Sequence, residues 1–313
     1  MAKTTKKCPT ILMFGATGFV AKHLIRKLSE FDITCIVRKL GVQKLEVKKV
    51  ITYDEVESLN YDLNFDYVID FASNVSVEKF VKQPLTTYLE NIDIPKKHLK
   101  ILQNLKFKGH YILISSDRAL VPNSNQRYIN NLKINNDPYG ASKFFSELML
   151  DYCVNILDAK FTILRLPNLY GPGQTSQQLV PTLIKRILSG EKRVEINSFD
   201  GSRNFLHVYD AVDAIKLFIE RPFNVKNIEI SGENIEISKL LHIIQVKFLK
   251  LKQLRCEFVE RDGPHQRTKY ILPPEFLDDR WFRENYDWVP RISIEEGVQT
   301  LIQDGGIYDR RKY

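Results

Sequence analysis

The apolar residues of this chain fall into short runs typical of buried strands, separated by longer stretches with helical periodicity. The first run, Thr10–Phe14, is followed by Gly15-Ala16-Thr17-Gly18. From Phe19 to Leu28, apolar residues recur every three or four positions, which predicts an amphipathic helix. The order strand, glycine turn, helix predicts the first unit of a parallel α/β sheet.

The same alternation continues to residue 166. Strands are predicted at 33–37, 49–53, 66–73, 109–114 and 160–166, and helices at 88–105 and 139–157. This order predicts a doubly wound, Rossmann-like parallel sheet for residues 1–166, which we assign to dinucleotide binding. A polar, Asn-rich segment at 123–136 is interpreted as an active-site flap or a surface loop.

After residue 166 the predicted strands become shorter. Helices are predicted at 179–188, 237–249 and 294–302, with short strands at 193–196, 228–230 and 257–259. We therefore expect residues 167–313 to form a smaller substrate-binding lobe, of which about 203–231 returns to the main sheet.

The first turn and the second strand together indicate a dinucleotide site. Glycines let the backbone approach a pyrophosphate, and the helix N-terminus at Phe19 and Val20 offers N–H groups and a positive dipole end. The third glycine position is Ala21, which the helix-packing role tolerates. Arg38 ends the second strand where NAD-binding proteins more often carry an acidic residue, so the sequence favours NADP and leaves NAD open. A solvated charge is the alternative interpretation of Arg38.

Tyr139 and Lys143 lie four residues apart on a predicted helix, so their side chains share one face. A phenol with a pKa near ~10 is a poor base at neutral pH, but a fixed ammonium beside it favours the phenolate. Tyr308 and Lys312 repeat this spacing, so spacing alone does not identify a site.

The residues upstream distinguish Tyr139. The predicted strand at 109–114 ends in Ser115-Ser116-Asp117, and ligands bind at the strand ends of open α/β sheets. The hydroxyl of Ser116 is a candidate to meet the same substrate oxygen as Tyr139.

Length, charge and cysteine content narrow the class of protein. The chain has 313 residues and a net charge of +8, but its Lys and Arg residues are spread out, so an anionic small ligand explains the excess as well as nucleic acid would. The four cysteines lie far apart, which argues against a zinc site or a disulfide framework, and no metal is expected. No apolar run reaches the ~18 residues of a spanning helix. We expect a cytoplasmic protein that binds neither nucleic acid nor membranes.

Taken together, these motifs resemble those of the extended short-chain dehydrogenase/reductase superfamily, in its NAD(P)-dependent epimerase/dehydratase group that acts on nucleotide sugars. The resemblance runs through nearly the whole chain. It rests on Gly15–Gly18 with Ala21, Ala72-Ser73, Asn91, Ser115-Ser116, Tyr139 with Lys143, Arg165–Asn168 before Tyr170–Pro172, and Ser202–Val208.

The resemblance implies roles for particular residues. Tyr139 would be the acid/base, Lys143 would bind the nicotinamide ribose and lower the tyrosine pKa, and Ser116 would hydrogen-bond the reacting sugar oxygen. Implied cofactor contacts are Gly15, Thr17, Gly18, Phe19, Val20, Arg38, Phe71, Ala72, Ser73, Tyr139, Lys143 and Pro167. Implied substrate contacts are Ser116, Asp117, Asn168, Arg203 and, as a second arginine, Arg267. The family's matching helices form a dimer's four-helix interface, so a homodimer is expected.

The reaction within this family stays open at this point. Ordinary 4,6-dehydratases place Asp-Glu after the catalytic hydroxyl because elimination needs both an acid and a base, whereas this chain has Asp117-Arg118. Inverting dehydratases, with Asp-Lys there, resemble it more. Arg38 favours an NADPH-dependent reductase of an NDP-4-keto-(6-deoxy)sugar over an NAD-dependent 4-epimerase. A non-catalytic dinucleotide sensor is least favoured, because such relatives usually lose the Tyr/Lys pair.

Overall fold

The computed structural model describes residues 8–41, 45–57, 64–75, 77–120, 127–129, 132–134, 138–174, 178–261 and 277–305. They belong to two compact units. As far as they are described, the first comprises Met1–Ala119, Pro138–Arg165 and Ile215–Ile228, and the second Leu120–Asp137, Leu166–Ala214 and Glu229–Tyr313. The functional assignment of 1–166 to dinucleotide binding and 167–313 to substrate binding remains a prediction.

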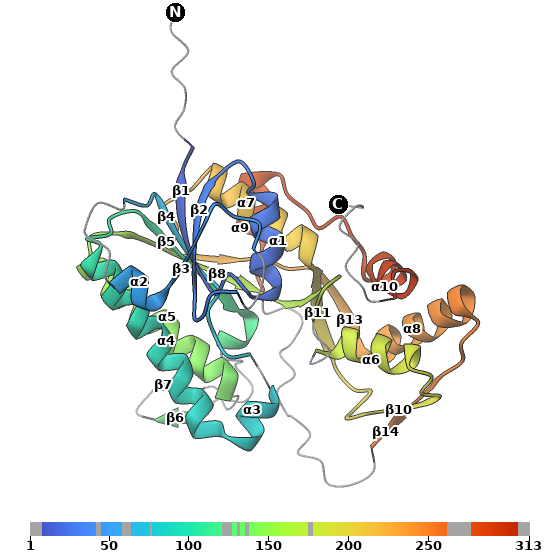
Figure 1. Ribbon diagram of the computed structural model, residues 1–313. Coiled ribbons are helices and arrows are strands. Elements are labelled where there is room, and N and C mark those ends of the chain that lie inside the picture. Colours follow the sequence, from blue (N-terminus) through green and yellow to red (C-terminus); the bar gives the residue numbers. More distant parts are fainter. Residues whose placement is uncertain are drawn as a thin grey trace, which may run out of the picture. The chain divides into compact units, whose positions relative to one another are not determined.

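A seven-stranded sheet forms the centre of the first unit, in the order β12-β8-β5-β4-β1-β2-β3 (Figure 1). The pairs β1/β2, β1/β4, β2/β3 and β4/β5 are parallel. The predicted α/β class with a Rossmann-like parallel sheet is confirmed. The strands are β1 (Thr10–Phe14), β2 (Asp32–Val37), β3 (Lys49–Thr52), β4 (Tyr67–Asp70), β5 (His110–Ser116), β8 (Lys160–Leu166) and β12 (Asn227–Glu229).

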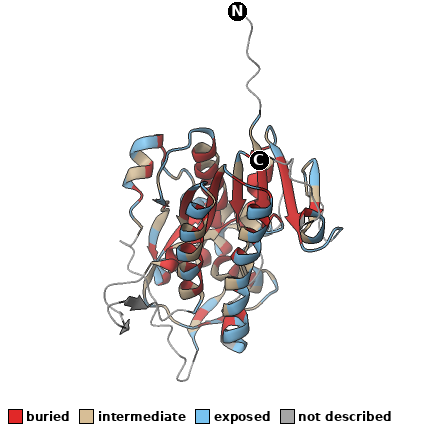
Figure 2. Cartoon of the chain, turned by 90° about the vertical axis from the view of Figure 1, so that its left-hand side faces the viewer, coloured by how far each residue is buried: buried red, intermediate tan, exposed pale blue. Residues whose placement is uncertain are grey.

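Helices cover both faces of this sheet (Figure 1). On one face, α2 (Tyr53–Glu57), α4 (Pro84–Asn104) and α5 (Pro138–Ile156) pack on alternate strand residues such as Phe14 and Tyr111. On the opposite face lies α1 (Phe19–Lys27), whose buried residues form the apolar stripe expected from the sequence. Figure 2 shows that α4 and α5 bury the side facing the sheet and expose the other. The short helix α3 (Val77–Lys82) precedes α4, and the 3-10 turn η1 (Asp117–Ala119) follows β5.

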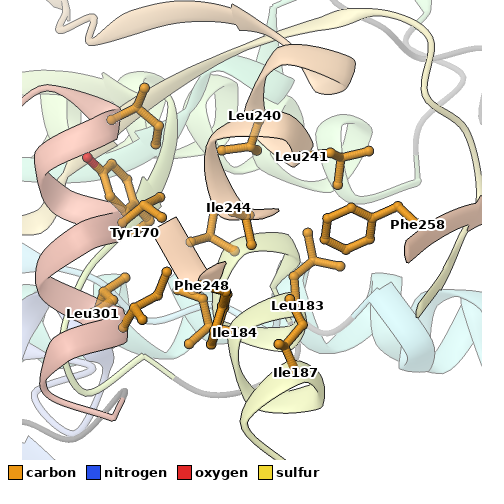
Figure 3. Packing of buried hydrophobic residues seen from close by; sticks show 14 of the residues in the cluster. Tyr170, Leu183, Ile184, Ile187, Leu240, Leu241, Ile244, Phe248, Phe258 and Leu301 are labelled. Atoms are coloured by element: carbon orange, nitrogen blue, oxygen red, sulfur yellow. The ribbon is translucent and has the colours of Figure 1, made fainter. Parts of the chain in front are cut away.

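The second unit has its own core, shown in Figure 3. Tyr170 lies within it and donates a hydrogen bond to the Ser293 carbonyl at 3.1 Å. Gly297 is required beside this ring, since a Cβ there would lie 2.4 Å from the Tyr170 hydroxyl. The elements around this core are β9 (Asn168–Tyr170), α6 (Leu179–Leu188), β10 (Arg193–Ile196), β11 (Ser202–His207), β13 (Glu233–Glu236), α8 (Ile237–Lys252), β14 (Glu257–Glu260) and α10 (Ile294–Gln303). Two further helices, α7 (Val208–Glu220) and α9 (Arg280–Tyr286), contribute no residue to it.

Several elements differ from the sequence expectations. The predicted strand 66–73 ends at Asp70, which leaves Phe71–Ser73 as a loop. The helix predicted from residue 88 begins at Pro84, because proline is well suited to a first helical turn. Within the polar segment 123–136, interpreted as an active-site flap or a surface loop, β6 (Arg127–Ile129) and β7 (Leu132–Ile134) form an antiparallel pair that the sequence analysis did not predict. No helix among the described residues is long and apolar enough to cross a bilayer.

Candidate active site

The glycine turn after β1 lies against the loop after β4. Gly15 has φ +71, and a Cβ on it would lie 2.7 Å from the backbone nitrogen of Ala72, so only glycine fits. Gly18 is the N-cap of α1 and no side chain caps the helix there. The first-turn N–H groups, beginning at Phe19 and Val20, therefore lack both intrahelical and side-chain partners. With Thr17 exposed in the turn, this end of α1 fits an anionic pyrophosphate.

The loop Phe71–Ser73 is held from both of its ends. At one end, the backbone N–H of Ala72 donates to Asp70 Oδ1 at 2.8 Å. At the other, the N–H of Asn74 donates to Asn91 Oδ1 at 2.6 Å, and Asn91 Nδ2 donates back to the Asn74 carbonyl at 3.1 Å. These half-buried loop residues are thus fixed beside the glycine turn, where they were predicted to line the cofactor.

Asn91 also fastens α4 to α5. Its Nδ2 donates to Ser142 Oγ at 3.0 Å. Pro95, four residues later, has no N–H for the Asn91 carbonyl, and Ser146 Oγ donates to that carbonyl instead at 3.2 Å. Because Asn91 and Pro95 lie well inside α4, they bring the loop after β4 and the helix of Tyr139 into one hydrogen-bonded group.

Tyr139 and Lys143 lie in the first turns of α5, as predicted. Tyr139 is half-buried, and its ring meets the edge of Phe80 at a centroid distance of 5.8 Å. Lys143 is buried, and its Nζ donates to the Ile114 carbonyl at 3.0 Å. Burial lowers the pKa of Lys143, while the carboxylates of Asp70 and Glu147 oppose that shift.

Besides Lys143, a hydrogen bond between Ser115 and Glu147 also connects the end of β5 to α5. Ser115 Oγ donates to Glu147 Oε1 at 2.5 Å, and Glu147 forms a buried ion pair with Arg165 at 2.8 Å. Ser116, the last strand residue, donates to Asp117 Oδ1 at 2.8 Å and accepts from the N–H of Arg118 at 3.2 Å. Ser116, Asp117, Tyr139 and Lys143 therefore lie on adjoining elements of one unit.

The remaining predicted residues lie elsewhere. Pro167, Asn168 and Arg203 belong to the second unit, where Asn168 pairs in register with Phe205, two residues beyond the exposed Arg203. Asn168 Nδ2 donates to the Asn204 carbonyl at 3.0 Å. Arg267 lies outside the described residues.

Asn204 follows Arg203 in β11, and its side-chain amide is bonded through both of its polar atoms. Asn204 Nδ2 donates to Asn234 Oδ1 at 2.6 Å, and its Oδ1 accepts from the N–H of Gly232 at 2.7 Å. An amide serves as donor and acceptor at once, which an ionised carboxylate does not.

Sequence reasoning missed the buried and half-buried polar residues that support the site. They are Tyr53, Asp70, Asn74, His98, Ser142 and Glu147. One signal was present: Asp70 interrupts the otherwise apolar β4, and a carboxylate in a buried strand needs partners. Glu147 was also visible one turn after Lys143, but its strand partner cannot be inferred from spacing.

A family model decides the class of this protein: that of the NAD dependent epimerase/dehydratase family matches residues 11–235. The chain belongs to this family. Members are NAD(P)-dependent enzymes that act on nucleotide sugars, so the predicted enzyme class and cofactor class are confirmed.

Curated relatives of this epimerase/dehydratase family member cover nearly all of it at low identity. It is 22% identical over 301 residues to CDP-abequose synthase of Salmonella muenchen, covering 93% of this chain and 96% of the relative. It is 23% identical over 319 residues to dTDP-4-dehydro-6-deoxyglucose reductase of Escherichia coli, covering 94% and 96%.

Solved structures agree with the fold. A UDP-glucose 4-epimerase of Thermotoga maritima, determined with UDP-glucose, has a TM-score of 0.76 at 23% identity and covers 94% of this chain and 97% of its own. RMD of Pseudomonas aeruginosa, complexed with NADPH, has a TM-score of 0.73 at 20% identity and covers 96% and 98%. At these identities the likeness concerns the fold alone.

Proposed function

We propose that this protein is an NADP-dependent oxidoreductase that reduces the 4-keto group of a nucleotide-diphosphate 4-keto-6-deoxysugar. The observation that carries this proposal is the fastening of α5 to the end of β5. Two hydrogen bonds, from Lys143 to Ile114 and from Ser115 to Glu147, hold the phenol of Tyr139 and the hydroxyl of Ser116 on adjoining elements.

The chemistry follows from these groups. Bound NADPH supplies a hydride for the carbonyl carbon. Tyr139 gives its phenolic proton to the carbonyl oxygen as that carbon is reduced, and Ser116 donates a hydrogen bond to the same oxygen. The Lys143 ammonium stabilises the phenolate left on Tyr139.

The residues after Ser116 favour reduction over elimination. Asp117 is buried and accepts the Ser116 hydroxyl, so its carboxylate is engaged in positioning. The next residue is Arg118, a cation that does not act as a carboxylate base. One relative points the same way, since it is named as a dTDP-4-dehydro-6-deoxyglucose reductase.

The alternative is an NAD-dependent 4-epimerase, because epimerisation at carbon 4 needs the same Ser116, Tyr139 and Lys143. In either reaction we assign Asn168 and Arg203 to the diphosphate of the substrate. Their strands, β9 and β11, are neighbours in the second unit, and Arg203 carries the charge that a diphosphate requires.

The test begins with the nucleotide that copurifies with the protein, identified by chromatography after denaturation. The reductase is expected to be empty, to bind NADPH and to oxidise it in step with loss of a dTDP- or CDP-4-keto-6-deoxyhexose. Tightly retained NAD, with interconversion of 4-hydroxyl epimers and no net NADPH consumption, would replace the reductase with the epimerase.

We further propose that the protein is a homodimer through α4 and α5. Figure 2 looks onto the face that carries these helices. Apolar side chains are exposed there at helical spacing, on α4 at Leu85 and Leu89 and on α5 at Phe145, Leu148, Tyr152 and Ile156. A second copy that presents the same helices would cover this apolar surface stripe.

Sedimentation of Leu148→Glu tests the dimer. A buried, unpaired carboxylate should weaken association at least ~100-fold, so the variant should sediment as a monomer at micromolar concentration. Leu249→Glu places the same charge on an exposed leucine of α8 and should leave the dimer intact. A monomeric wild type, or a dimeric Leu148→Glu, contradicts the assignment.

A further inference from the structure

Tyr53 is a half-buried aromatic residue flanked by two cations. In the parallel pairing of β2 and β3, Val37 is in register with Thr52, so Arg38 and Tyr53 are the next residues at the ends of neighbouring strands. The charge of Arg38 is close enough to act on the Tyr53 phenol. From α4, Lys97 Nζ lies 4.5 Å from the centroid of the Tyr53 ring. Two cations from different elements thus gather at the strand ends where the cofactor is expected.

Beneath Tyr53, a chain of buried polar groups leads to the cofactor loop. The hydroxyl of Tyr53 lies 2.9 Å from His98 Nε2, and His98 Nδ1 lies 2.6 Å from Asp70 Oδ2. The His98 ring stacks on Phe14, the residue before the glycine turn, at a centroid distance of 3.7 Å. Asp70 also accepts from Tyr111 and from the N–H of Ala72.

The carboxylate of Asp70 is held in place by the hydrogen bonds it makes. Burial alone raises the pKa of Asp70, but the adjacent His98 and the hydrogen bonds that Asp70 accepts bring it below the ordinary value. Burial raises the pKa of Tyr53, so this residue stays a neutral phenol and does not repel an anion. Burying the Asp70–His98 pair costs free energy unless its polar atoms are bonded, and both side chains are buried and bonded here. The two groups that bond this pair from outside, the Tyr53 hydroxyl and the N–H of Ala72, lie at the strand ends where the cofactor is expected.

We propose that Lys97 and Tyr53 complete, together with Arg38, a site for the 2′-phosphate of NADP, and that His98 and Asp70 are positioning residues for Tyr53. Arg38 and Lys97 supply the charge, and Tyr53 forms the wall that keeps the two cations apart. The inference rests on the proposed NADP dependence and names the residues that select the phosphorylated cofactor.

Lys97→Gln tests the charge. Affinities for NADPH and NADH are measured by fluorescence titration without any sugar, so the result is independent of turnover. NADPH affinity is expected to fall about 10-fold, as for loss of one charge-assisted contact, with NADH affinity changed less than about 3-fold. Arg38→Gln should behave likewise, and Lys100→Gln, an exposed lysine of the same helix, should change neither.

Two results would overturn this assignment. Equal losses for both dinucleotides would place Lys97 at the pyrophosphate that they share. Unchanged NADPH affinity would show that Lys97 is a solvated charge. Failure of the sugar assay alone, with the NADPH preference intact, would count against the proposed reaction and leave the phosphate site standing.

His98→Leu and Tyr53→Phe test the positioning. Both remove the Tyr53–His98 hydrogen bond, and both should lower the ratio of NADPH to NADH affinity by ~3- to 10-fold. His110→Gln is the matched control, because His110 is equally buried and bonded to Thr162 at 2.8 Å but begins β5 at the other end of the strand. If both test variants melt at a lower temperature but keep the wild-type ratio of NADPH to NADH affinity, His98 has a structural role only.

Discussion

Both units have an apolar core, but among the described residues the first unit buries more charged and polar side chains than the second. In the first, charged and polar residues lie together near the carboxyl ends of the strands, among them Asp70, Asn91, His98, Lys143 and Glu147. In the second, the cluster in Figure 3 consists of aliphatic and aromatic residues. Burial of polar groups costs free energy unless they are bonded, so their concentration at one edge of the sheet indicates that the first unit keeps them for a reason other than stability.

The comparison predicts that mutations in the polar region change function more than stability. Tyr139→Phe keeps the ring beside Phe80 and removes only the hydroxyl that we propose as the proton donor. Turnover should fall ~100- to 10,000-fold, the usual contribution of a general acid. Single-turnover kinetics and NADPH titration measure the two effects separately, and NADPH affinity should stay within about 3-fold of wild type. Near-normal turnover would mean that another group is the acid.

Lys143→Met makes the comparison sharper, because it removes a buried charge. Turnover should fall about 100-fold with the loss of the charge that tunes Tyr139, and NADPH should bind about 10-fold more weakly. The melting temperature should stay unchanged or rise, since an apolar side chain is cheaper to bury than an ammonium whose pKa burial already lowers. Calorimetry that shows marked destabilisation would assign Lys143 to the fold.

The same contrast explains what the sequence was able to predict. The pattern of apolar residues predicted the observed bounds of α6 and β1. In both cases the apolar residues that form the pattern are the ones that become buried. It also placed Tyr139 and Lys143 on one helix, a local property. It did not find the Asn91–Ser142 bond or the Asp70–His98 pair, which join residues 51 and 28 positions apart.

Polar contacts between residues far apart in the sequence cannot be predicted from hydrophobic periodicity, because the two partners do not recur at a regular spacing. His98 has the helical position of an ordinary buried residue, and only the structure shows Asp70 against one ring nitrogen and Tyr53 against the other. α7 was missed for a different reason. It follows β11 directly, without a glycine or proline to mark its start at Val208.

The apolar core of the second unit should respond in the opposite way. Ile244→Ala leaves a cavity in the cluster of Figure 3 and should destabilise the protein by about 2–5 kcal/mol. Leu249→Ala, an exposed position on the same helix, should cost less than about 0.5 kcal/mol. Chemical denaturation measures both. NADPH affinity of the folded Ile244→Ala protein should equal that of wild type, and a large loss would contradict the separation of roles.

The smallest expected effect concerns a polar pair of the second unit, formed by the buried Asn204 and the exposed Asn234. Asn204 and Asn234 bond across β11 and β13 through their side chains, whereas Asn168, which we assign to the substrate diphosphate, contacts only the backbone carbonyl of Asn204. Because each amide exchanges water for one protein partner, the pair should contribute only about 1 kcal/mol, measured as the coupling free energy in a cycle of Asn204→Ala, Asn234→Ala and the double variant. All three proteins should keep wild-type NADPH affinity. A coupling near zero would show that Gly232, whose N–H also bonds Asn204, holds this turn by itself, whereas altered NADPH binding would extend the functional role of polar residues into the second unit.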